Sequence, residues 1–78
     1  MTVILSTVDT RGQSCPGPLV TLHKALKDAR RGDLLELLAT DPGARSDVPS
    51  WAKLSGNELV ESSEDDGVLR FVIRKVSA

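Results

Sequence analysis

The chain has 78 residues, of which 40% are apolar and 27% charged, and its formal net charge is −1. A chain of this length has room for one modest core, so we expect residues 1–78 to form a single domain without a large substrate cleft. The near-neutral charge argues against direct nucleic-acid binding, which depends on many Lys and Arg contacts. The apolar run Val3-Ile4-Leu5 is too short for a membrane span and lacks signal-peptide features, so we expect a cytoplasmic protein without membrane attachment.

The first half of the chain predicts a strand, a polar loop and a helix. Val3 to Asp9 alternates as a strand does, and the segment Thr10 to Ser14 is polar and contains a glycine. From Pro16 to Arg31 apolar residues recur at helical spacing, which indicates an amphipathic helix of about four turns. Gly32 is the residue type that commonly closes a helix.

A second strand and a second helix are expected next. The nearly continuous apolar run Leu34 to Thr40 is typical of an interior strand. Ala44 to Ser55 has helical periodicity, but Pro49 is disruptive beyond a first turn. We therefore expect the regular part of this helix to begin near Asp47, which would cap it, after an irregular lead-in.

Two further strands complete the pattern. Glu58 to Ser63 predicts a third strand, and Asp66-Gly67 is a hairpin signal before a fourth strand from Val68 to Val76. In that last strand Arg70 and Arg74 share one face, and we expect both to reach solvent. The order βαβαββ predicts an α+β protein: a two-layer α/β sandwich with a four-stranded mixed sheet and two helices on one face.

The chemistry of the chain centres on Cys15, its one cysteine. A single cysteine cannot form an internal disulfide, and with His23 as the one histidine a zinc site built from Cys and His is excluded. Cys15 is therefore a packing residue, a reactive thiol or a point of covalent attachment. His23 lies eight residues away, roughly 12 Å along a helix by rise alone, so a Cys-His catalytic pair is not expected.

The position of Cys15 favours a reactive thiol. Lone cysteines are most often packing residues, but this one lies where a polar loop meets a helix, between Gln13-Ser14 and Pro16, and such junctions lie at the surface. As the N-cap, Cys15 would face unpaired amides and the positive end of the helix dipole, which favour a thiolate. Arg11 could act in the same direction. Pro16 and Pro18 would stiffen the first turn.

The segment Cys15-Pro16-Gly17-Pro18 resembles the Cys-Pro-x-Pro signature of the TusA (SirA/YeeD) sulfur-carrier family. The resemblance covers nearly the whole chain, because Asp9-x-Arg11-Gly12 precedes the motif, Gly32-Asp33 precedes the second strand, and Asp41-Pro42 precedes the second helix. It implies a fold similar to the C-terminal domain of translation initiation factor three, in agreement with the βαβαββ order.

The resemblance also implies a function. Cys15 would accept sulfane sulfur as a persulfide from a cysteine desulfurase or a rhodanese and pass it to an acceptor protein, without cofactor or metal. Arg11, Gly12, Pro16 and Pro18 would be supporting motif residues. Such a sulfurtransferase of the carrier type is expected to be a monomer when free, and its sulfur could serve transfer-RNA thiolation, molybdenum-cofactor assembly or sulfur oxidation.

The same resemblance implies a docking surface for the donor. It would lie on the exposed side of the first helix and the neighbouring loop, at His23, Lys27 and Asp41. The alternative is a noncatalytic regulatory or protein-interaction module, in which Cys15 is a plain surface thiol and the open sheet face or the basic helix binds the partner. A disulfide oxidoreductase would need a second thiol that the chain does not contain.

Overall fold

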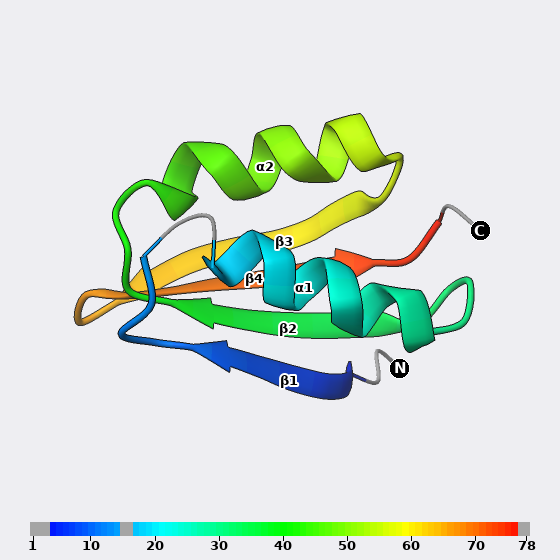
Figure 1. Cartoon of the computed structure of the whole chain (residues 1–78), viewed down its shortest axis with the longest axis horizontal. Coiled ribbons are helices and arrows are strands. Elements are labelled where there is room, and N and C mark those ends of the chain that lie inside the picture. Colours follow the sequence, from blue (N-terminus) through cyan, green and yellow to red (C-terminus); the bar gives the residue numbers. More distant parts are fainter. Residues whose placement is uncertain (1–3, 15–16, 77–78) are drawn as a thin grey trace.

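The computed structural model describes residues 4–14 and 17–76. The elements follow in the predicted order βαβαββ (Figure 1): β1 Ile4–Thr10, α1 Gly17–Asp28, β2 Leu34–Ala39, α2 Ala44–Ser55, β3 Glu58–Asp65 and β4 Val68–Arg74. The four strands form one sheet in the order β1-β2-β4-β3. β1 and β2 are parallel and the other two pairs are antiparallel, so the sheet is mixed, as expected.

Both helices lie on the same face of the sheet and start from the same edge (Figure 1). This edge is where β1 and β2 end, and the β3–β4 hairpin turn lies there too. Each helix runs back across the sheet because it connects the end of one strand, at this edge, to the start of the next strand, at the opposite edge. The fold is the predicted two-layer α/β sandwich.

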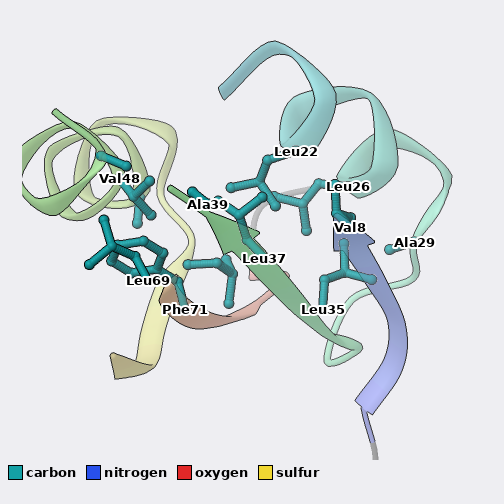
Figure 2. Close-up of a cluster of buried hydrophobic side chains, with 13 residues drawn as sticks. Val8, Leu22, Leu26, Ala29, Leu35, Leu37, Ala39, Val48, Leu69 and Phe71 are labelled. Carbon is teal, nitrogen blue, oxygen red and sulfur yellow. The ribbon is translucent and has the colours of Figure 1, made fainter. Parts of the chain in front are cut away.

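The core lies between the two layers (Figure 2). Leu22 and Leu26 point inward from α1, and Val48 does so from α2. They meet every second residue of the two central strands, as the alternation of a strand requires. The sheet contributes Leu35, Leu37, Ala39, Leu69, Phe71 and Ile73, each at most 5% exposed.

The first helix is shorter than its apolar pattern indicated. It ends at Asp28 rather than Arg31, because the amide of Arg30 donates to the Asp33 carboxylate at 2.8 Å and the chain enters a turn. Gly32 has the positive φ expected of it, 94°, but it lies in that turn rather than directly at the helix end. Its amide donates to the carbonyl of Lys75.

The second helix begins earlier than predicted. Gly43 is its N-cap residue and Ala44 its first residue, so the predicted irregular lead-in is helical and the expected cap at Asp47 is wrong. Pro49 lies inside the helix, where its ring lines a cleft beside Leu69 and Phe71. Pro49 is half-buried there, and as a proline it cannot donate the backbone hydrogen bond of its position in the helix.

Strand ends differ from the expectation by a few residues. β2 ends at Ala39 instead of Thr40, β3 extends to Asp65 instead of Ser63, and β4 ends at Arg74 instead of Val76. β1 includes Thr10, and the predicted start at Val3 lies outside the described residues. The hairpin signal is confirmed: Asp66 and Gly67 both have positive φ, 51° and 81°, as a tight two-residue turn requires.

The sheet face without helices carries ion pairs across the strands. Arg70 binds Glu36 on β2 and Glu61 on β3, and Arg74 binds Glu58 at 2.6 Å. Thr7 on β1 donates to Glu36 at 2.8 Å, so this network crosses the whole sheet. Both arginines reach solvent, but Arg70 does so only in part, because its ion pairs with Glu36 and Glu61 leave its side chain 31% exposed.

Candidate functional site

The candidate site is the loop between β1 and α1, at the edge of the sheet where both helices begin (Figure 1). Cys15 and Pro16, the centre of the predicted motif, lie outside the described residues. The structure describes the residues on both sides of them, and these form the frame to which the cysteine is attached.

On the N-terminal side the frame is a hydrogen-bonded turn. The amide of Gln13 donates to the carbonyl of Thr10 at 3.1 Å, and the amide of Gly12 donates to Oγ1 of Thr40 at 2.8 Å. Gly12 has a φ of 86°, a left-handed conformation that side chains with a Cβ avoid. This explains the glycine at this motif position.

Arg11 is held by Asp9. Its Nε and Nη2 donate to Oδ1 and Oδ2 of Asp9 at 2.9 Å and 2.7 Å, and its amide donates to Oδ1 at 3.1 Å. These bonds, first of all the one from the Arg11 side chain, lower the pKa of Asp9 to about 2. The carboxylate compensates the charge of Arg11, a pairing that the sequence did not indicate.

On the C-terminal side the frame is the start of α1. The amide of Gly17 donates to the carbonyl of Ser14 at 2.9 Å, and the carbonyl of Gly17 accepts from the Thr21 hydroxyl at 3.0 Å. Pro18 is fully buried, so it anchors the first turn to the core in addition to stiffening it. A Cβ on Gly17 would come within 3.0 Å of Gln13 Oε1, so the glycine lets the Gln13 side chain lie close.

Hydrogen bonds to residues at the ends of β1 and β2 attach this frame to the sheet. Thr10, the last residue of β1, is fully buried and its hydroxyl donates to the carbonyl of Leu38 at 2.6 Å. Thr40, the first residue after β2, accepts from Gly12. Sequence reasoning placed these threonines in a loop and at a strand end and assigned neither a role. Their only signal was a hydroxyl residue at the carboxyl end of each of two adjacent strands.

The three predicted docking residues fall into two groups. His23 and Lys27 are exposed on α1, beside a groove of about 280 Å³ between the two helices. Trp51 of α2 meets the His23 ring edge-on, with 6.4 Å between the ring centroids. Asp41 is half-buried in the loop that leads to α2, next to Thr40, and so lies on the cysteine side.

Apolar side chains at the surface of the helix layer were missed by the sequence analysis. Val20 in α1 is 47% exposed and Leu54 in α2 is 87% exposed. Leu54 was read as part of the periodic pattern of the second helix, whereas Val20 was assigned to no pattern; periodicity alone does not separate a buried side chain from one at the margin of the apolar face.

Two other kinds of site are absent from the part of the chain that the structure describes. Within 4–14 and 17–76 the structure brings together no group of three or more metal-binding His, Asp or Glu side chains. None of the described helices has the length and apolarity needed to cross a bilayer.

The sequence is similar to proteins that are named as sulfur carriers. The model of the family described as sulfurtransferase TusA matches residues 6–75. A Halobacterium salinarum protein whose name proposes a sulfur-carrier role is 44% identical over 73 residues, which cover 92% of this chain and 90% of the relative. Sulfur carrier protein TusA of Pseudomonas paraeruginosa is 41% identical over 68 residues, which cover 87% of this chain and 86% of the relative.

A solved structure agrees. The crystal structure of a SirA-like protein from Desulfitobacterium hafniense superposes with a TM-score of 0.80 at 27% sequence identity, covering 94% of this chain and all of that one. The fold is that of a small two-layer α/β domain, shared with this SirA-like protein. The chain belongs to the TusA family, which supports a role in carrying sulfur.

Proposed function

We propose that this protein is a sulfurtransferase of the carrier type and that Cys15 holds the transferred sulfur as a persulfide. The observation that carries the proposal is the match to the TusA family over residues 6–75, a range that contains the one cysteine of the chain within Cys15-Pro16-Gly17-Pro18. The described frame supports it, because the residues on both sides of Cys15 are fixed by hydrogen bonds and by the buried Pro18.

The proposed reaction exchanges sulfur between thiols. The Cys15 thiolate attacks the outer sulfur of a donor persulfide; a bond forms between the two sulfurs, and the donor leaves as a thiolate. The sulfane sulfur keeps its oxidation state, so no external oxidant or reductant is needed. An acceptor nucleophile then attacks the outer sulfur of the persulfide. The bond between the two sulfurs breaks, and Cys15 is released as a thiolate. Neither step needs a cofactor or a metal.

The start of α1 suits this exchange. The amides of a first helical turn and the helix dipole stabilise an adjacent anion, and the first turn of α1 contains no acidic side chain that would oppose this effect. The thiolate is the attacking form in the first step and the leaving group in the second. A helix start that favours the thiolate therefore assists the release of sulfur.

The partners would be proteins. The donor would be a cysteine desulfurase or a rhodanese in the cytoplasm, and the acceptor a later protein of the relay, in transfer-RNA thiolation, cofactor assembly or sulfur oxidation. The free carrier would be a monomer. His23 and Lys27 would contact the donor from α1, and Asp41 would contact it from the loop beside the cysteine frame. Arg11, Gly12, Pro16 and Pro18 would support the thiol.

The structure adds a reason to prefer the helix side over the open sheet face as the docking surface. On the sheet face Arg70 and Arg74 already bind carboxylates of this chain. A partner there would have to compete with these ion pairs. On the helix side the apolar Val20 and Leu54 are exposed, and α1 also carries the exposed Lys24 and Lys27, a combination that suits a protein partner.

Intact-mass spectrometry tests the proposal. Reduced protein would be incubated with a cysteine desulfurase and cysteine, or with a rhodanese and thiosulfate, in parallel with Cys15→Ala. We expect the mass to rise by one sulfur atom, to return on addition of a reductant, and to stay constant in the variant. If no active donor adds sulfur to the wild-type protein, the interaction-module alternative is favoured instead.

A further inference from the structure

One hydrogen bond joins the loop before Cys15 to a neighbouring part of the fold. The amide of Gly12 donates to Oγ1 of Thr40 at 2.8 Å. Gly12 follows the end of β1 by two residues, and Thr40 directly follows β2. Because β1 and β2 are parallel, their carboxyl ends meet at one edge of the sheet, and this brings two residues 28 positions apart into contact.

The other hydrogen bonds described for residues 11–14 stay within the segment from Asp9 to Gly17. Arg11 binds Asp9, the amide of Gln13 donates to Thr10, and the carbonyl of Ser14 accepts from Gly17. These bonds determine the local shape of the loop. They do not determine its position relative to the next loop, which begins at Thr40.

We propose that Thr40 is a positioning residue for Cys15, acting through the amide of Gly12; this proposal rests on the proposed function. Thr40 is exposed and its backbone is outside β2. Its hydroxyl links the cysteine loop to the loop that carries Asp41. The hydrogen bond therefore fixes Gly12, three residues before Cys15, relative to the loop that carries Asp41.

The physical reason is preorganisation. Sulfur transfer requires the attacking thiolate to lie in line with the bond that breaks, and small misplacements of reacting atoms are costly. Gly12 alone would leave the loop free to sample other conformations, because glycine has the widest range of backbone angles. The bond to Thr40 selects the conformation with a φ of 86° at Gly12.

The experiment compares Thr40→Val, which keeps the shape but removes the acceptor, with Thr40→Ser, which keeps the hydroxyl. The matched control is Thr7→Val, because Thr7 also uses its hydroxyl to join β1 to β2, through Glu36 on the opposite sheet face. Two rates are measured for each variant: sulfur uptake from a cysteine desulfurase with cysteine, and alkylation of Cys15 by iodoacetamide across pH.

We expect Thr40→Val to take up sulfur roughly fivefold more slowly, the factor that one ordinary hydrogen bond would supply if it acted entirely on the reactive geometry. Its alkylation profile should move to higher pH, because the loop that leads to Cys15 is no longer fixed and the helix start can stabilise the thiolate less well. Thr40→Ser and Thr7→Val should match the wild type in both measurements. If Thr40→Val folds poorly, Thr40→Ala removes the same acceptor with less bulk and should give the same two changes.

The outcomes separate this proposal from the proposed function. Wild-type rates in both measurements for Thr40→Val, or equal losses in Thr40→Ser, would overturn the positioning role. If the wild-type protein takes up no sulfur while Thr40→Val still shifts the alkylation profile, the carrier function fails and the positioning role stands. The iodoacetamide measurement makes this distinction because it needs no sulfur donor.

Discussion

Asp9 and Arg11 form a two-pronged ion pair directly before the cysteine loop, with both carboxylate oxygens bonded to the guanidinium at 2.9 Å and 2.7 Å. Because the pKa of Asp9 is lowered to about 2, the pair contributes stability above the unfolded value of about 3.9 and loses it as the pH falls towards 2. An NMR titration of the Asp9 carboxyl should have its midpoint near pH 2 in the wild type and close to the ordinary value in Arg11→Gln. Arg45→Gln breaks the comparable exposed pair with Glu64 and should leave the Asp9 midpoint unchanged.

Glu36 is the centre of the ion-pair network on the open sheet face. Hydrogen bonds from Arg70 first, and then from the Thr7 hydroxyl, lower its pKa. We expect Glu36→Gln to reduce the free energy of unfolding by about 1 kcal/mol at pH 7, since the pair is partly shielded from solvent. The difference from the wild type should begin to shrink as the pH falls below the ordinary carboxylate pKa, because only the unfolded state then binds the proton, and it should vanish once Glu36 is protonated in both states. Urea unfolding at pH 7 and pH 3 measures it, and an equal difference at both values would contradict the assignment.

Two leucines on different sides of the helix layer test the placement of the core. Leu22 of α1 is fully buried, whereas Leu54 of α2 is 87% exposed. Leu22→Ala should lower the free energy of unfolding by about 2–5 kcal/mol, because it removes apolar contacts and leaves a cavity. Leu54→Ala should change it by less than about 0.5 kcal/mol. Chemical denaturation of both variants decides the point, and similar losses would show that the layer is packed differently.

Gly12 tests the conformation of the cysteine loop. No atom lies within 4 Å of a Cβ added at this position, so any penalty of substitution comes from the φ of 86° rather than from a clash. Gly12→Ala should cost about 1–2 kcal/mol of stability and slow sulfur uptake. Gly12→Asn should cost less, because asparagine tolerates the left-handed conformation better. Equal effects of the two substitutions would speak against the conformational explanation.

Lys27 tests the docking surface. Lys27→Glu should slow sulfur uptake from a desulfurase severalfold, because a reversed charge at the rim of an interface reduces the rate of association. It should not change alkylation of Cys15 by iodoacetamide, a small uncharged reagent. Lys53→Glu is the matched control, since Lys53 is an exposed lysine on α2 that does not line the groove beside His23. Equal slowing by the two substitutions would point to net charge instead of a specific surface.

Periodic features of the sequence were the most informative about the fold. The helical spacing of Leu22 and Leu26, the apolar run of β2 and the Asp66-Gly67 turn each determine local structure, and their order led to the correct sandwich. Element ends were less accurate, because they depend on single hydrogen bonds made by particular side chains. The amide of Arg30, for example, is captured by Asp33, and this ends α1 a turn early.

The candidate site was only partly visible in the sequence. Cys15 with its two prolines, together with Gly12, could be recognised because the cysteine is unique and the motif is contiguous. The opposite case is Arg11, which the sequence suggested as a cation for the thiolate and which the structure pairs with Asp9. Its role depends on the orientation of the Asp9 carboxylate, which cannot be read from the sequence.

The sequence by itself therefore determined the order of the elements, the identity of the one thiol and the family to which the motif belongs, because these depend on residue types and their local spacing. Only the tertiary structure decided that Thr40 meets Gly12 and that Arg70 is shared between Glu36 and Glu61. Both contacts arise from strand pairing between segments far apart in the chain, and they depend on register. The parallel alignment of β1 and β2 is what brings the cysteine loop and the Asp41 loop to one edge.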